Sequence, residues 1–219
     1  MKNVKYLSVA VCVLFFSCEI TEQIRDKLMV FGVDFRFDNV AVSPVIPAGL
    51  QTILDVMPKK AGSSEADQNI YDQYLSTTGL NVICTLTANN PNENRAVFDG
   101  ADFHLRINDT TKQDSAVTTR VDTFSVKGND STKMAIAFPL MLDNPAFSKS
   151  TFQKIIEGRD IPYKLSADLF FNLIVPSMTG ESDTLKGEPV ALDLVNSALP
   201  TRPTDNMVSL FLRALDLLL

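Results

Sequence analysis

Apolar and polar residues alternate along much of the chain, and this two-residue period is the feature that most constrains the fold. Successive side chains of a β-strand point to opposite faces, so such alternation is typical of strands with one buried face. Turn-forming Pro, Asn, Asp and Gly recur at short intervals between the alternating stretches, which favours an all-β fold. The apolar positions of four stretches are Phe31, Val33, Phe35 and Phe37; Leu80, Val82, Cys84 and Leu86; Ala101, Phe103, Leu105 and Ile107; and Met134, Ile136, Phe138, Leu140 and Leu142.

Three parts of the sequence depart from this period. Residues 43–78 contain three prolines and two stretches, 49–57 and 69–76, that could each form a short helix. We interpret them as a helical insertion between two strands, where specificity could reside, because long loops without a role are uncommon. Residues 145–158 predict a helix that begins at a proline and ends at a glycine. Residues 205–219 predict an amphipathic helix.

The last predicted strands form a hairpin. Residues 161–175 and 183–195 each predict one long strand, and the turn-rich sequence Pro-Ser-Met-Thr-Gly-Glu-Ser separates them. Two such strands on either side of a short turn pair with each other in an antiparallel hairpin.

The amino terminus has the organisation of an export signal. A short basic region precedes an apolar run, Tyr6 to Phe16, which is too short for a membrane span of about 20 residues. The run ends at Ser17-Cys18, as in bacterial lipoprotein signals, where the cysteine becomes the lipidated first residue. We therefore predict a signal peptide at 1–17, lipidation of Cys18, a tether at 18–28 and an outer-membrane lipoprotein of the bacterial envelope. Ordinary secretion and a retained anchor are the alternatives, since Phe15 and Phe16 depart from the usual signal pattern.

The charge of the chain excludes two classes of partner. The formal net charge is −6, and removal of Lys2 and Lys5 with the signal would make it −8. Nucleic acids and anionic lipid surfaces attract clustered Lys and Arg, so neither is an expected partner. Cys84 would be the only unmodified cysteine of the mature chain, so no intramolecular disulfide is expected, and its place in an apolar alternation predicts a buried thiol.

The residue types that carry catalysis are sparse, and we predict that the protein is not an enzyme. His104 is the only histidine, and its alternation neighbours are Asp102 and Arg106 on the polar face. An exposed or cross-strand histidine is the interpretation we favour, and a deep polar pocket beside it would indicate an unrecognised enzyme site. No metal site, cofactor site or small-molecule substrate is predicted, because one histidine and one thiol cannot build a zinc centre alone.

Several of these segments together resemble the late-embryogenesis-abundant type-two (LEA type 2) family, also called the water-stress-and-hypersensitive-response (WHy) domain. The resemblance covers residues 29–196. The segments that carry it are 80–92 with Asn-Pro-Asn, 98–109, the strand-turn-strand 121–142, and 160–171 with Ile-Pro-Tyr.

The resemblance implies a fibronectin-III/immunoglobulin-like antiparallel β-sandwich and a role in desiccation and stress responses. Bacterial members are often exported lipoproteins, and no catalytic residues belong to the family. The implied β-sandwich spans 29–200, with the insertion at 43–78. The insertion and the C-terminal helix, 201–219, are additions to the family pattern.

Two features leave a structural and a functional interpretation open. Asn90-Pro91-Asn92 is expected to form a corner between the sheets, with a ligand site as the alternative, because Asn caps its own backbone and Pro fixes φ. The apolar face of the C-terminal helix either packs across an open end of the sandwich or docks a protein partner. The residues of that docking hypothesis are Met207, Leu210, Phe211, Leu215 and Leu218.

Two functions are consistent with the sequence. The first is a non-catalytic, lipid-anchored envelope protein with an LEA-like binding or stabilising domain. The second is a structural or assembly subunit of an envelope complex, docked through the insertion or the C-terminal helix.

Overall fold

The computed structural model describes residues 29–56, 64–107, 116–159, 162–176, 182–186, 190–196 and 205–219. The predicted signal peptide at 1–17 and the tether at 18–28 lie outside these residues. The described part is mostly β, and all of its strand pairings are antiparallel. Within it, no helix is both long enough and apolar enough to cross a membrane.

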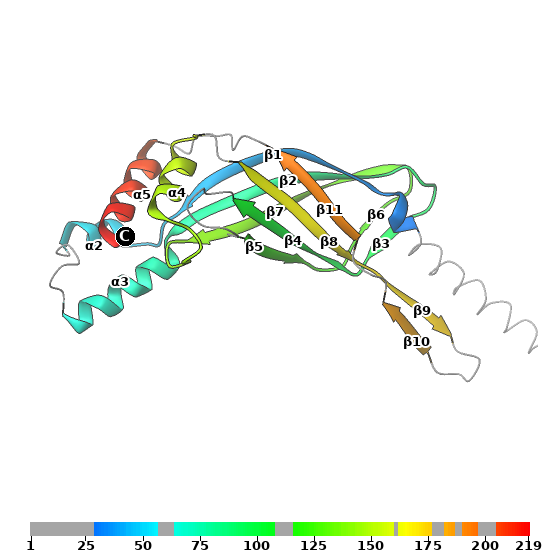
Figure 1. The fold of residues 1–219 in the computed structure, drawn as a ribbon, viewed down its shortest axis with the longest axis horizontal. Coiled ribbons are helices and arrows are strands. Elements are labelled where there is room, and N and C mark those ends of the chain that lie inside the picture. Colours follow the sequence, from blue (N-terminus) through cyan, green and yellow to red (C-terminus); the bar gives the residue numbers. More distant parts are fainter. Residues whose placement is uncertain are drawn as a thin grey trace, which may run out of the picture.

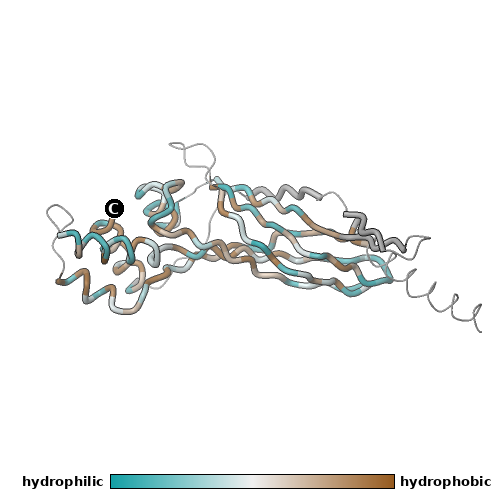
Figure 2. The backbone as a smooth tube through the Cα atoms, turned by 90° about the horizontal axis from the view of Figure 1, so that it is seen from below, coloured by the Kyte–Doolittle hydropathy of each residue, from teal (hydrophilic) through white to brown (hydrophobic). Residues whose placement is uncertain are grey.

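The strands lie in two layers, which Figure 2 shows from the side. The first sheet has the order β1-β2-β7, with β1 at Asp34–Val45, β2 at Gly79–Asn90 and β7 at Asp130–Met141. The second sheet has the order β11-β8-β4-β5, with β11 at Val190–Asn196, β8 at Tyr163–Phe170, β4 at Gly100–Ile107 and β5 at Ala116–Val121. Two smaller pairs complete the strands: β3 (Ala96–Phe98) with β6 (Phe124–Val126), and β9 (Asn172–Pro176) with β10 (Ser182–Lys186).

The core lies between the two sheets. The ring of Phe37 on β1 faces that of Tyr163 on β8, with centroids 6.1 Å apart. Leu80, Val82 and Leu86 on the central strand β2 are fully buried. Each such side chain contributes roughly 1.5–3 kcal/mol on burial. The predicted buried faces of β2, β4 and β7 are confirmed, since every apolar position named for them is buried or half-buried.

A bulge in β1 changes which residues face the core. Phe35 and Phe37 pack against the core from odd positions, whereas Val40 and Val42 are buried at even positions. The pairing with β2 shifts between Phe37 and Asn39. A one-residue bulge moves the following side chains to the other face. Val33, Phe35 and Phe37 pack against the core as expected, but the strand begins only at Asp34, because a 3₁₀ turn, η1 (Met29–Gly32), precedes it.

The predicted hairpin is confirmed, with an interruption. β8 pairs with β11, and β9 pairs with β10, so each long predicted strand is divided in two. The first of these strands is interrupted at Phe171, a buried residue that separates β8 from β9 in sequence.

Helices occur where the two-residue period fails. The insertion contains α2 (Leu50–Val56) and α3 (Glu65–Thr77), and the C-terminal segment forms α5 (Asp205–Leu218). The helix expected at 145–158 is α4 (Lys149–Ile156). It begins later than Pro145 because the Ser148 hydroxyl accepts a hydrogen bond from the Thr151 backbone N–H and caps the helix. Gly158, at φ +67°, follows its C-terminus as predicted.

Candidate interaction surface at the helical end

The four helices α2, α3, α4 and α5 gather at one end of the sheets, which we call the helical end. The η1 turn (Met29–Gly32), in blue at the start of the described chain, lies at the opposite end of the molecule, which we call the Met29 end (Figure 1). α5 contacts α2, α3, α4 and β1, so the C-terminal helix joins the insertion to the β layers.

The inner face of α5 belongs to the core. Phe211, Leu215 and Leu218 are at most 1% exposed. The ring of Phe211 lies 6.3 Å from that of Phe152 on α4. A partner therefore cannot reach these three side chains. They pack in the core, which is the first of the two alternatives given for the C-terminal helix. Their spacing of three and four residues places them on one side of the helix.

Two of the five predicted docking residues remain at the surface. Met207 is 38% exposed, and Leu210 is half-buried. Both line a hollow of about 440 Å³ between α2 and α5, together with Gln51, Asn206, Ser209 and Arg213. The docking hypothesis is thereby restricted to the first two turns of α5 and the facing side of α2.

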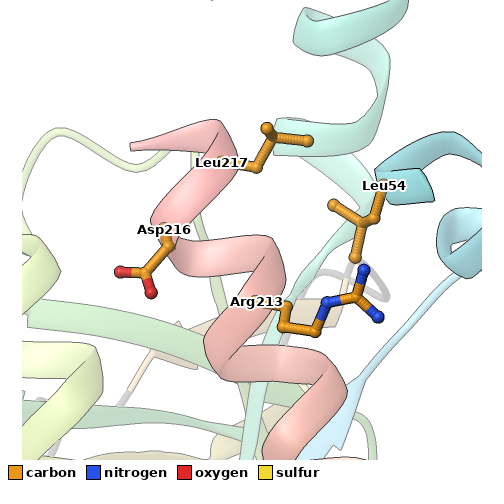
Figure 3. A pocket seen from close by; sticks show the side chains of 4 residues that line it. All are labelled: Leu54, Arg213, Asp216 and Leu217. Carbon is orange, nitrogen blue, oxygen red and sulfur yellow. The ribbon is translucent and has the colours of Figure 1, made fainter. Parts of the chain in front are cut away.

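A second hollow lies further along the same pair of helices. It has a volume of about 410 Å³, and Leu54, Arg213, Asp216 and Leu217 line it. Figure 3 shows Arg213 extending from α5 toward Leu54 on α2. Arg213 lines both hollows, and we call the two hollows together the α2–α5 groove.

Ion pairs hold the walls of this groove. An Nη2 nitrogen of Arg213 donates to Oδ1 of Asp55 on α2 at 2.7 Å, and both side chains are 54% exposed. Asp216, which lines the second hollow, is paired with α4: its Oδ1 lies 3.2 Å from Nζ of Lys149. Exposed pairs contribute little to stability, about 0–1 kcal/mol. Their role here is to orient α5 relative to α2 and α4.

Exposed apolar side chains are concentrated at the helical end. Among the side chains that the structure describes, the large apolar ones with more than a third of their surface exposed are Val56 (76%), Leu219 (48%), Met207 (38%) and Ile70 (36%). They belong to α2, α3, α5 and the residue after α5. Single exposed apolar residues are normal, but their restriction to one end of the described molecule makes that end a candidate interaction surface.

Asn90-Pro91-Asn92 is a corner at the Met29 end. The Asn90 amide is fully buried, and its nitrogen donates to the carbonyls of Asn94 (2.8 Å) and Val126 (3.1 Å). Its oxygen accepts from the Asn92 backbone N–H at 3.1 Å. The bond to Val126 ties the exit of β2 to β6, and the other two lie within the turn itself, which fits the corner interpretation.

Asn92 extends the corner to the start of the described chain. Its side-chain nitrogen lies 3.5 Å from the Met29 carbonyl oxygen. A Cβ on Gly32 would stand 2.4 Å from the same nitrogen, so η1 packs closely against the corner. The entry of the chain into β1 is thereby fixed to the exit of β2.

His104 lies on the outer face of the second sheet. Its Nδ1 is 2.8 Å from the Thr118 hydroxyl, and its Nε2 is 3.2 Å from Oδ2 of Asp168, so the ring bridges three strands. A hydroxyl, an imidazole and a carboxylate are the groups of a hydrolytic triad. However, β4 is paired on both sides, so its backbone N–H groups donate within the sheet and are not directed at an oxyanion. The cross-strand interpretation accounts for these contacts.

Two further residue types were singled out by the sequence. Cys84 is fully buried on β2, and burial raises the pKa of its thiol to about 12, so it is not a nucleophile at neutral pH. Within the described ranges, no three His, Cys, Asp or Glu side chains are grouped so as to hold a metal ion. Cys18, the predicted lipidation site, lies outside these ranges.

Comparisons with known proteins give only distant likenesses. No known family profile matches the chain, and no curated protein matches it. A protein from Archaeoglobus fulgidus is similar with a TM-score of 0.32 and 8% identity, over 75% of this chain and 100% of that one. The solution structure of a proposed late embryogenesis abundant (LEA) protein is similar with a TM-score of 0.33 and 12% identity, over 90% of each chain. The sporulation control protein Spo0M of Bacillus subtilis is similar with a TM-score of 0.22 and 12% identity, over 69% of this chain and 48% of that one. TM-scores this low do not establish a shared fold.

Proposed function

We propose that this protein is a non-catalytic binding protein of the bacterial cell envelope, anchored by a lipid on Cys18. Its β layers form a fibronectin-III-like sandwich of the LEA type-two kind, and its helical end carries the binding surface. The export signal and the motifs at 80–92 and 160–171 support this proposal at the level of sequence.

The observation that carries the proposal is the separation of the two ends. The large exposed apolar side chains among the described residues belong to the helices and to Leu219 after α5, and the η1 turn (Met29–Gly32) lies at the other end. Cys18 precedes Met29 by a short stretch of chain, so a lipid on Cys18 would hold the Met29 end toward the membrane. The helical end would then face away from the lipid, where it is accessible to another protein.

The absence of enzyme activity is part of the proposal. His104 is engaged on both ring nitrogens within a paired sheet, and the Cys84 thiol is buried and protonated. The backbone N–H groups of β4 donate within the paired sheet and are not directed at an oxyanion beside His104, and the Cys84 thiol is not an activated nucleophile.

The experiment that tests the proposal is crosslinking in the cells that produce the protein. The protein is purified through an internal tag, and co-purifying proteins are identified by mass spectrometry. We expect one dominant envelope protein, and its yield should fall at least several-fold in a Val56→Asp, Met207→Asp double variant. Thr123→Asp, an exposed position between β5 and β6, is the control and should not change the yield.

Deletion of α5 is not a suitable variant for this experiment. The helix supplies Phe211, Ala214 and Leu215 to the core, so its removal would unfold the helical end. Equal recovery of the partner by the double variant and the wild type would contradict the proposed surface.

A second candidate function is protection of other proteins during drying, as the LEA resemblance implies. The sequence resemblance of residues 80–92 and 160–171 to that family is what supports it. Recovery of an enzyme after drying with and without the purified protein tests it. If the enzyme recovers no better than with serum albumin, protection during drying is refuted and only the docking function remains.

A further inference from the structure

We propose that two copies of this chain pair through the free edge of β1, as antiparallel strands centred on Ala41. The pairing joins the β1-β2-β7 sheets of the two copies into one continuous sheet. This inference goes beyond the proposed function, because it concerns a different surface and has a second copy of the chain as the occupant.

β1 is an edge strand with a neighbour on one side only. Among the described strands it pairs with β2 alone. The other edge strand of the same sheet, β7, is tied to the second sheet, because the Thr119 hydroxyl on β5 donates to the Ala137 carbonyl at 2.7 Å. The outward N–H and C=O groups of an edge strand are a template for another strand, so the β1 edge can accept one.

The bond from Thr119 also determines which backbone groups of β1 point outward. The Ala137 carbonyl is directed away from β2, and Ala137 lies opposite Ile83 of β2. The backbone groups of Ile83 therefore point to the other side, where Ile83 lies opposite Ala41 of β1. Because these groups alternate along an antiparallel strand, Ala41 bonds to β2, whereas Val40 and Val42 direct their N–H and C=O groups to the free edge.

Features that block strand addition flank a short window of β1. The charged residues Arg36 and Asp38 and the bulge at 37–39 precede the window. Pro44 follows it and has no N–H to donate. Residues 39–43, which carry no charge, remain as the part of the edge that is open to another strand.

The sequence of this window is complementary to itself. When Ala41 faces Ala41 of the second copy, Val40 faces Val42 and Asn39 faces Ser43. The valine pairs are the ones with outward N–H and C=O groups, so each pair exchanges two hydrogen bonds. Both valines are buried on the core face, and Asn39 and Ser43 are exposed on the outer face, so each residue faces one of its own kind. No like charges meet in this register.

Antiparallel pairing determines how the two molecules lie relative to each other. β1 runs from the Met29 end toward the helices, so the Met29 ends of the two copies point in opposite directions (Figure 1). A pair anchored through both Cys18 residues would lie along the membrane, whereas an unpaired chain would stand on it as in the proposed function. Pairing and upright anchoring are therefore alternative states of the protein.

Disulfide trapping tests the pairing and its register. In this arrangement Ala41 belongs to a pair without hydrogen bonds, with its Cα about 4.5 Å from that of the second copy, which a disulfide can span. Ala41→Cys is introduced into the full chain, in the cells that produce it, and the cells are treated with an oxidant. We expect a disulfide-linked dimer on non-reducing gels, at least tenfold more abundant than for the unsubstituted chain.

Two further cysteine variants are matched controls. Ser43→Cys lies on the same strand and the same face, but its counterpart in the second copy is about 13 Å away, too far for a disulfide. Ala137→Cys is exposed on the opposite edge strand, β7. Both should give no more dimer than the unsubstituted chain. Equal dimer from Ser43→Cys, no dimer from Ala41→Cys, or a disulfide from Ala41→Cys to a different protein would overturn the inference.

A charge swap at the same position needs no oxidant. Ala41→Lys and Ala41→Glu each place like charges opposite one another, so each variant alone should be mostly monomeric. Mixed in equal amounts, the two variants place opposite charges there and should dimerise. Sedimentation velocity of the detergent-solubilised full chain measures the association, after circular dichroism melts have established that each variant folds. A monomeric unsubstituted chain, or equal association of the separate and the mixed variants, would overturn the inference.

Discussion

Asn90 shows how one buried side chain can hold a corner of the fold. Its amide nitrogen donates to two carbonyls, and its oxygen accepts one backbone N–H, within a site that excludes water. Asn90→Ala should therefore lower the free energy of unfolding by about 2–4 kcal/mol, because it leaves buried backbone groups without partners. Urea denaturation measures this loss as a lower midpoint with an unchanged slope.

The adjacent residue is the matched control. Asn89 is exposed on the same strand, so Asn89→Ala should change stability by no more than about 0.5 kcal/mol. Similar losses at both positions would mean that the Asn90 contacts do not stabilise the corner.

Cys84 makes stability depend on pH in the alkaline range. Burial raises its pKa from 9.0 to about 12, so between these values the folded chain keeps a proton that the unfolded chain releases. The free energy of unfolding should consequently fall by roughly 1.4 kcal/mol for each pH unit above 9. Below pH 9 both states hold the proton, and the effect vanishes.

The comparison with Cys84→Ala isolates this effect. Tyrosine and lysine titrations are common to both proteins, so the difference in stability between them should change steadily from pH 9 to pH 11. Denaturation at fixed pH values measures it. A constant difference over this range would contradict a raised thiol pKa.

At the scale of single residues, the sequence predicted burial more fully than it predicted contacts. The buried thiol and the corner followed from period-two alternation and from turn chemistry. The donors and acceptors around Asn90 could not be predicted, because Val126 is distant in sequence and meets Asn90 only after the sheets assemble. The pairing of Arg213 with Asp55 could not be predicted for the same reason, since the two residues are distant in sequence and join the two additions to the β layers.

At the scale of elements, α5 has an inner face that packs in the core and an outer face that is exposed to solvent. Phe211→Ala should lower the free energy of unfolding by about 3–5 kcal/mol, because it opens a cavity beside Phe152. Met207→Ser, on the exposed side of the same helix, should cost less than about 1 kcal/mol. Thermal unfolding followed by circular dichroism measures both, and a Met207→Ser loss as large as that of Phe211→Ala would place Met207 in the core.

Element types were predictable where the period was uniform and failed where one residue changed it. The helices of the insertion and α5 were expected and are present. The bulge in β1 was not, because the apolar residues before and after it each alternate correctly and only their relation to β2 reveals the shift. The beginning of α4 was misplaced because Pro145 suits a first turn, whereas Ser148 supplies the cap.

At the scale of the whole molecule, the proposed orientation of the protein rests on lipidation of Cys18. Cys18→Ala should abolish incorporation of labelled palmitate, since the predicted lipid is attached at that thiol. Cys12→Ala, in the apolar run of the predicted signal, is the matched control and should leave incorporation unchanged. Gel fluorography of the immunoprecipitated protein gives the measurement, and label retained by Cys18→Ala would contradict the predicted anchor.

The arrangement of the two sheets, and their closure by helices at one end, followed only in part from the sequence. Alternation predicted which strands have one buried face, and the late hairpin was predicted correctly. The α2–α5 groove could not be predicted, because its walls come from segments on either side of the β strands in sequence.

The packing of η1 against the corner has a mechanical consequence. β1 leaves the Met29 end and runs along the molecule toward the helices, paired with β2 along its length (Figure 1). Tension between an anchor at the Met29 end and a partner held at the helical end would act parallel to these strands. The β1–β2 hydrogen bonds would then share the load in shear instead of opening one after another, and the two strands would resist pulling along this direction.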